Sequence, residues 1–107
     1  MPLLKKYTKQ PWDVKDYDVD YAEWLAEVTP SDTLATISEP IVECISEDPD
    51  NTLVVDSADI TATRIKIMVS GGTDGKRYKV TLRVTTAGVD SYVRKDECEL
   101  EFIVKDT

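Results

Sequence analysis

The sequence predicts an all-β fold, a two-sheet antiparallel β-sandwich with at most one short helix. Apolar and polar residues alternate through much of residues 33–107, which is typical of strands with one buried face. Turn-forming Gly, Pro, Asn and Asp residues separate these alternating runs. The runs lie too close together for helical crossovers, so we expect no parallel strand pairs.

Six runs are predicted to be strands. The last two flank a turn at residues 87–91 and are expected to form an antiparallel hairpin. Pro40 lies between the first two runs and indicates a sheet edge or a bulge. Residues 56–59 are predicted to be a turn. The predicted strands cover residues 33–38, 41–46, 53–55, 63–69, 76–86 and 98–105.

The glycine-rich segment at residues 70–75 is predicted to be a structural turn. Gly71, Gly72 and Gly75 indicate backbone with positive φ, and Asp74 is a local hydrogen-bond acceptor or turn former. A strand follows this segment rather than a helix, which is unlike a phosphate-binding loop. Tyr78 is placed like the tyrosine of a tyrosine corner, whose hydroxyl bonds back to the adjacent turn.

One short helix is predicted within residues 10–32. Asp20 is the expected N-cap and Glu23 completes a capping box, while Pro30 ends the helix. One face of this helix carries Tyr21, Trp24, Leu25 and Val28 at helical spacing. We expect Tyr17, Tyr21 and Trp24 to pack over one end of the sandwich.

Residues 1–20 are predicted to form an extended N-terminal arm, and residues 21–107 the sandwich of what is a single domain overall. The arm is basic on an otherwise acidic chain, and Trp12 is expected to be exposed until a partner covers it. This asymmetry predicts head-to-tail association between copies. The candidate partner-binding residues are Lys5, Lys6, Tyr7, Lys9, Trp12 and Tyr17.

The composition argues against catalysis and against nucleic-acid binding. The 107 residues contain no His, which removes the usual general base and the commonest metal ligand. The formal net charge is −8, which disfavours phosphate-backbone contacts. No run is long and apolar enough to span a membrane, and no secretory signal is recognised, so cytoplasmic synthesis is expected. No cofactor is expected.

Two smaller features leave alternatives open. The acidic residues Glu47, Asp48 and Asp50 either form a solvated turn, which we favour, or contribute to a calcium site with Asp56 and Asp59. Cys44 and Cys98 are expected to be reduced thiols, with a disulfide between strands as the minority interpretation.

Several segments resemble a family of small tailed-phage virion proteins, the immunoglobulin-like fibre–tail adaptors. They are KYTKQP at residues 6–11, DYDVD at residues 16–20, DTL at residues 32–34, and VSGGTDG at residues 69–75 followed by Tyr78. The resemblance implies an immunoglobulin-like sandwich with no catalytic residues.

The resemblance also implies a role in the particle. A protein of this family is expected to be a structural virion component, made in the bacterial cytoplasm, that joins tail, fibre or connector proteins in several copies. A capsid decoration protein or a host-surface binding module on the same fold is the alternative. A minor enzyme or a calcium-dependent sugar binder is a third and weaker hypothesis.

Overall fold

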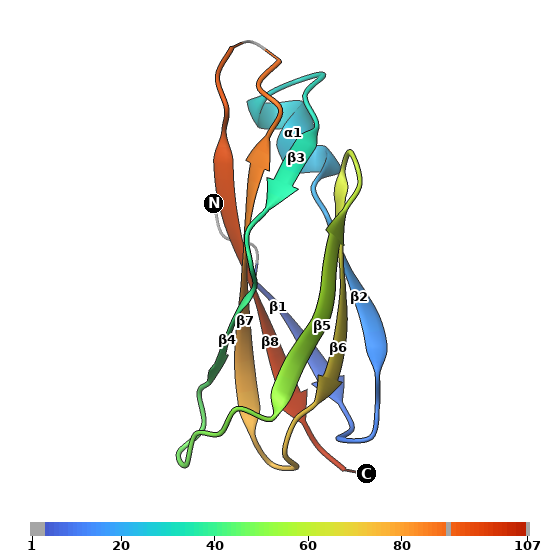
Figure 1. Ribbon diagram of the computed structural model, residues 1–107, viewed down its shortest axis with the longest axis vertical. Helices are drawn as coiled ribbons and strands as arrows, with labels where there is room; N and C mark the ends of the chain where they lie inside the picture. Colours follow the sequence, from blue (N-terminus) through green and yellow to red (C-terminus); the bar gives the residue numbers. More distant parts are fainter. Residues whose placement is uncertain (1–3, 90, 107) are drawn as a thin grey trace.

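The computed structural model describes residues 4–89 and 91–106 as two packed β-sheets with one short helix at one end (Figure 1). The molecule is elongated, with extents of 47 × 22 × 20 Å. The five-stranded sheet contains β1 (Leu4–Lys9), β8 (Lys95–Val104), β7 (Arg77–Thr86), β3 (Leu34–Ile37) and β4 (Ile41–Cys44). The three-stranded sheet contains β2 (Lys15–Asp20), β6 (Arg64–Gly71) and β5 (Leu53–Ile60). The helix α1 spans Ala22–Val28.

The predicted all-β sandwich is confirmed. β7 and β8 form the expected antiparallel hairpin, with Tyr78 opposite Phe102 and Leu82 opposite Cys98. β3 and β4 pair with successive halves of β7, and Pro40 lies in the gap between them. Because Pro has no backbone N–H to donate, a sheet edge is where it does least harm, as the sequence predicted.

The core lies between the inward faces of the two sheets. Alternate residues of β6, β7 and β8 supply most of it, which matches the period-two pattern in the sequence. Val19, Tyr21 and Leu25 extend this core toward α1. The largest fully buried apolar side chains are Tyr78, Phe102, Ile65, Ile67, Leu82 and Leu100.

The N-terminal segment corrects two predictions. Residues 4–9 and 15–20 do not form an arm outside the sandwich, because they are strands β1 and β2, one at an edge of each sheet. β1 also pairs parallel with β8, although no parallel pair was expected. The short connections between successive strands do not exclude this pair, because β1 pairs with the last strand and nearly the whole chain serves as the crossover.

Two local predictions also change. Residues 56–59 are not a turn, since β5 continues through them with a register shift between Val55 and Ser57. Such a bulge accommodates an extra residue without ending the strand. The N-cap of α1 is Tyr21 rather than Asp20, and no side chain caps the helix there. Asp20 nevertheless accepts a hydrogen bond of 2.9 Å from the Ala22 amide.

The two cysteines are free thiols on different strands of the five-stranded sheet. Cys44 on β4 lies opposite Tyr78, whereas Cys98 on β8 lies opposite Leu82, so their positions are four residues apart along β7. Cys98 is fully buried, and burial raises the pKa of its thiol. Both observations agree with the expectation of reduced thiols.

Candidate partner-binding surfaces

The turn between β1 and β2 presents the most exposed aromatic side chain among the described residues. Trp12 is 92% exposed, and the neighbouring Val14 is also exposed. The turn is closed by a hydrogen bond from the Asp13 amide to the Gln10 carbonyl, 3.1 Å long. The expected exposure of Trp12 is thus confirmed, but on a tight turn instead of a loose arm.

Lys9 holds this turn against the body of the protein. Its side chain is 1% exposed, and its ammonium donates to the carbonyl oxygens of Gly71 at 2.6 Å and Gln10 at 2.8 Å. Burial lowers the pKa of this ammonium. Lys9 was predicted to face a partner, yet its charge is satisfied inside the molecule. Its role here is to join the β1–β2 turn to the end of β6.

Tyr7 and Tyr17 form a half-buried aromatic cluster with Phe102. The ring centroids of Tyr7 and Tyr17 lie 4.7 Å apart, and each ring lies within 5.4 Å of the Phe102 ring. Burial raises the pKa of both tyrosines. These two predicted partner residues therefore pack mainly within the sandwich, whereas Lys5 and Lys6 of β1 are exposed.

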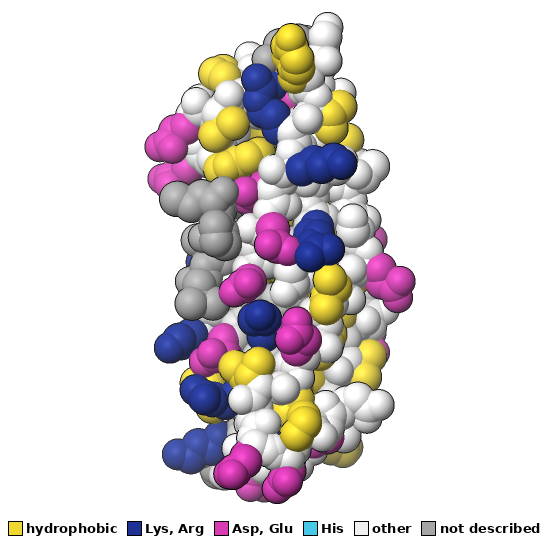
Figure 2. Space-filling model, turned by 90° about the vertical axis from the view of Figure 1, so that its left-hand side faces the viewer, with side chains coloured by type: hydrophobic (Ala, Val, Ile, Leu, Met, Phe, Trp, Pro, Cys, Tyr) yellow, Lys and Arg dark blue, Asp and Glu magenta, His cyan; other side chains and the backbone are white. Residues whose placement is uncertain are grey.

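The opposite end of the molecule carries a second exposed apolar surface that the sequence reasoning missed. It consists of Val89, Tyr92 and Val93 in the β7–β8 loop, with Val28 of α1 also exposed. Tyr92 is 71% exposed. Figure 2 shows hydrophobic side chains gathered at this end of the molecule, above a face where acidic and basic side chains alternate. The available signal was three large apolar residues, Val89, Tyr92 and Val93, in the segment between the predicted strands at 76–86 and 98–105.

Asp32 supports the loop that carries this second surface. Its buried carboxylate accepts hydrogen bonds from the Thr33 amide at 2.8 Å and from the Gly88 amide at 3.2 Å. Burial alone would raise the pKa of Asp32, but these backbone hydrogen bonds outweigh it and lower the pKa. Arg94 donates to the Thr29 hydroxyl at 3.2 Å, which ties the far side of the loop to the segment after α1.

The glycine-rich segment forms the turn between β6 and β7. Gly71, Gly72 and Gly75 all have positive φ, and a Cβ at Gly71 would lie 2.2 Å from the Thr52 carbonyl oxygen. The Tyr78 hydroxyl accepts a hydrogen bond of 2.9 Å from the Thr73 amide, which is the predicted tie to the turn. These contacts hold the β6–β7 turn in one conformation.

Asp50 and Asp74 join neighbouring segments to this turn. Asp50 accepts hydrogen bonds of 2.6 Å from the hydroxyls of Thr73 and Tyr78, which lower its pKa to about 2. Asp74 accepts a hydrogen bond of 2.9 Å from the Asp106 amide. Among residues 4–89 and 91–106, no group of three or more Cys, Asp or Glu side chains is placed to hold a metal ion. Asp50 is thus a hydrogen-bond acceptor in this structure, and the calcium hypothesis gains no support from its surroundings.

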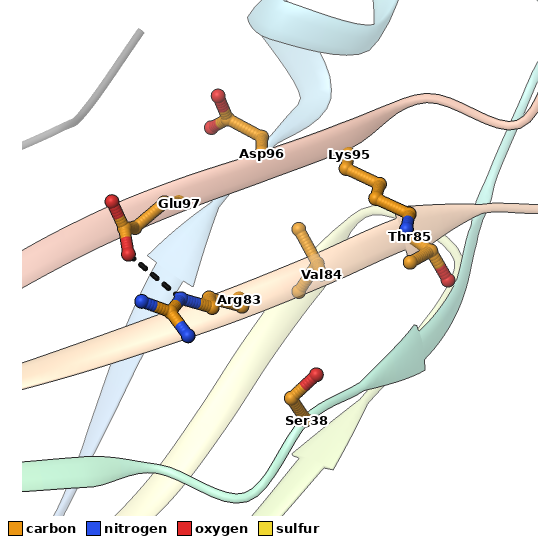
Figure 3. Close-up of a pocket in the computed structure, with 7 residues that line it drawn as sticks. All are labelled: Ser38, Arg83, Val84, Thr85, Lys95, Asp96 and Glu97. Atoms are coloured by element: carbon orange, nitrogen blue, oxygen red, sulfur yellow. Dashed lines mark hydrogen bonds and ion pairs between the residues drawn. The ribbon is translucent and has the colours of Figure 1, made fainter.

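A depression of about 610 Å³ lies on the outer face of the five-stranded sheet. Figure 3 shows Arg83 of β7 and Glu97 of β8 side by side, joined by an ion pair of 2.8 Å, while Asp96 points away from this pair. The lining side chains offer no nucleophile paired with a base. They are Ser38, Arg83, Val84, Thr85, Lys95, Asp96 and Glu97. We therefore regard the two exposed apolar ends, and not this depression, as the candidate functional surfaces.

The one helix in the described part of the chain, α1, is too short to cross a membrane.

Comparison with known proteins identifies the family of this chain. No curated protein matches the chain. The family model for the podophage GP4 fiber-tail adaptor protein gp77 matches residues 9–97, from the last residue of β1 to the first residues of β8, and this range contains both Trp12 and Tyr92. The chain therefore belongs to the family of the podophage GP4 fiber-tail adaptor protein gp77.

Proposed function

We propose that this chain joins the tail of a podophage to its fibre by contacting a different neighbour at each end of the sandwich. The observation that carries the proposal is that Trp12 on the β1–β2 turn and Tyr92 on the β7–β8 loop are both exposed. The β1–β2 turn and the β7–β8 loop lie at opposite ends of a molecule 47 Å long (Figure 1). Aromatic side chains that become buried at an interface are common binding hot spots. An adaptor needs two such surfaces that do not obstruct each other.

Each end supplies a different kind of contact. Trp12 projects from a turn that Lys9 fixes to the body, so its binding costs little conformational entropy. Truncating such an anchor typically weakens binding by about 2–4 kcal/mol. Tyr92 and its valine neighbours lie on a longer loop, which suits a broader apolar contact. The mechanism is assembly, and the proposal assigns no catalytic residue and no cofactor.

Several copies of the chain are proposed to act together in the virion after synthesis in the bacterial cytoplasm. Multiple weak end contacts then combine into a stable attachment, because the copies are held near one another. We include self-association of the chain in this proposal. The exposed Lys5 and Lys6 are its predicted contributors.

The test compares phages in which one end is altered at a time. We expect Trp12→Ser and Tyr92→Ser to produce different particles: one lacks this chain, and the other retains the chain but lacks fibres. Immunoblots and electron microscopy of purified particles distinguish the two defects. Ile41→Ser is the matched control, because Ile41 is 38% exposed on β4 and lies opposite Thr81 near the middle of β7, away from both ends.

Complete, infectious particles from both end variants would contradict the proposal. Labelling the chain in intact wild-type particles gives a separate check. A label confined to the capsid would instead support a decoration protein, and a label at the distal fibre tip would support a host-surface binding module.

A further inference from the structure

The two flanks of the sandwich differ in the regularity of their edge strands. On one flank, β3 and β5 each contain a register shift, and Pro40 separates β3 from β4. Such interruptions discourage another strand from adding to a sheet edge. On the other flank, β1 and β2 each keep a continuous six-residue register with their sheet neighbour. Within the described residues, this second flank, which we call the β1–β2 flank, presents two regular open edges.

The two edges of the β1–β2 flank carry opposite charge. β1 carries the exposed Lys5 and Lys6, and the segment Lys5–Lys9 contains no acidic residue. β2 exposes Asp16, Asp18 and Asp20, because the alternate residues of this strand face the core. Charge complementarity between facing strands favours pairing, and like charges directly opposite each other disfavour it.

Asp18 is the acidic residue of β2 that is left available for such a contact. Asp16 pairs with Lys66 at 3.1 Å and Asp20 pairs with Arg64 at 3.6 Å, both within the three-stranded sheet. Asp18 forms no ion pair with any residue that the structure describes, and the same is true of Lys6. Within the part of the chain that the structure describes, Lys6 and Asp18 thus lie on adjacent edges of one flank without an ion pair.

We propose that the β1–β2 flank binds the same flank of a second copy, with β1 of each copy antiparallel to β2 of the other. β1 and β2 run in opposite directions, since a short turn joins them. A two-fold axis parallel to the strands therefore brings β1 beside β2 of the other copy in antiparallel orientation and extends both sheets across the dimer. The other two-fold axis, perpendicular to the sheets, would place β1 against β1 and β2 against β2. That arrangement brings the lysines of the two β1 strands together and the aspartates of the two β2 strands together. The charge pattern therefore favours the arrangement in which β1 lies beside β2 of the other copy.

The same geometry predicts which residues meet. Rotation about an axis parallel to the strands leaves each residue at its own height, so β1 residues meet β2 residues that lie level with them. Tyr7 and Tyr17 are equally distant from Trp12 along the chain and their rings are in contact, which shows that such residues are level. By the same rule Lys6 lies level with Asp18, and both side chains face outward. Each dimer would contain two Lys6–Asp18 pairs related by symmetry.

The proposal rests on the self-association included in the proposed function and names its surface. Sedimentation equilibrium of the purified full chain is expected to show a dimer that weakens as salt is raised. Lys6→Glu places like charges opposite each other at two symmetric positions, so we expect dimer affinity to fall about tenfold or more. The double variant Lys6→Glu/Asp18→Lys restores opposite charges and is expected to recover most of the affinity. Lys95→Glu is the control, because it makes the same charge change on β8 outside this flank.

Disulfide formation tests the arrangement independently of affinity. Lys6→Cys/Asp18→Cys is expected to yield a covalent dimer under oxidation, whereas Lys6→Cys alone is expected to yield none. A chain that stays monomeric at every concentration, or a covalent dimer from Lys6→Cys alone, would overturn the proposal. Trp12→Ser and Tyr92→Ser should dimerise like the parent chain. A particle defect in these end variants with intact dimerisation therefore bears on the proposed function and not on this interface.

Discussion

The end of the molecule that carries Trp12 and the end that carries Tyr92 are held in place by different means. At the Trp12 end, side chains connect separate turns: Lys9 joins the β1–β2 turn to β6, and Asp50 joins the β4–β5 loop to Thr73. At the Tyr92 end, α1 covers the core, and Asp32 and Arg94 bond to backbone and hydroxyl groups around the longer β7–β8 loop.

The difference shows that two exposed aromatic side chains can differ in how firmly their segments are held before a partner binds. An aromatic side chain on a turn that is fixed on several sides loses little freedom when a partner covers it. A loop supported mainly at its base loses more conformational entropy when a partner orders it, but it can adapt to a less complementary surface. We therefore expect the Trp12 end to be the more rigid and the Tyr92 end the more adaptable.

The largest expected effect on the free energy of unfolding comes from a substitution at Gly71, which lies at the Trp12 end. Gly71→Ala places a Cβ at 2.2 Å from the Thr52 carbonyl oxygen, in a residue with a φ of 76°. The clash and the positive φ together are expected to lower the free energy of unfolding by about 2–4 kcal/mol. Urea denaturation followed by circular dichroism measures this loss.

Gly75→Ala is the matched control for this prediction. Gly75 has a φ of 85°, but no atom lies within 4 Å of the added Cβ. Only the backbone strain remains, so the expected loss is about 1 kcal/mol. Equal losses at Gly71 and Gly75 would show that the close approach to Thr52 is not important to this end.

A smaller effect is expected from removing one hydroxyl at each end. Tyr78→Phe leaves the Thr73 amide without its hydrogen-bond acceptor and removes a donor to Asp50, and should cost about 1–3 kcal/mol. Tyr21→Phe removes the hydrogen bond of 2.9 Å to Asp96 near α1. It should cost about 1 kcal/mol, less than Tyr78→Phe, because the Tyr78 hydroxyl contacts three partners, Thr52, Thr73 and Asp50. The two free energies of unfolding are compared under one set of conditions. A larger loss for Tyr21→Phe would reverse the proposed contrast between the ends.

Acid is expected to weaken the Trp12 end through Asp50. Hydrogen bonds from Thr73 and Tyr78 lower the pKa of this carboxyl from 3.8 to about 2, so the unfolded chain binds its proton at higher pH than the folded chain does. The stabilisation is complete above about pH 4 and is lost as the pH falls toward about 2. Asp50→Asn should therefore reduce the slope of thermal stability against pH in this window.

Asp32→Asn gives the corresponding measurement at the Tyr92 end. The pKa of Asp32 is also lowered, so its contribution to the acid slope has the same sign. We expect the smaller change in slope from Asp32, because opposing burial offsets part of its hydrogen bonding. An unchanged slope in Asp50→Asn would show that this carboxylate does not stabilise the folded state.

The sequence predicted the central strands well and the N-terminal edges poorly. β7 and β8 alternate between core and solvent over ten residues each, so their pattern is visible without any knowledge of their neighbours. β1 and β2 are six residues long and rich in charge, and only their pairing with β8 and β6 makes them strands. A prediction based on local pattern cannot supply a parallel partner that lies at the other end of the chain.

The candidate surfaces were predictable only where exposure follows from local sequence. Trp12 follows Pro11 in a polar stretch, and its exposure was expected. Lys9 was expected to be exposed on its charge alone, but the Gly71 carbonyl comes from a strand sixty-two residues later. Residues 87–91 of the β7–β8 loop were recognised as a turn. The sequence around the two valines of this loop does not show whether their side chains face the core or the solvent.

The smallest expected effect on stability comes from the residue with the largest proposed effect on binding. Trp12 is 92% exposed and contributes little to the core, so Trp12→Ala should change the free energy of unfolding by less than about 0.5 kcal/mol. Trp24 packs edge-on against Tyr21 with ring centroids 5.5 Å apart, so Trp24→Ala should cost about 1–3 kcal/mol. Fluorescence adds a second measure, because Trp12 alone, in Trp24→Phe, should be fully quenched by acrylamide. Strong protection of Trp12 from quenching in the isolated chain would mean that its turn is already covered, and would remove the reason for assigning a partner to that end.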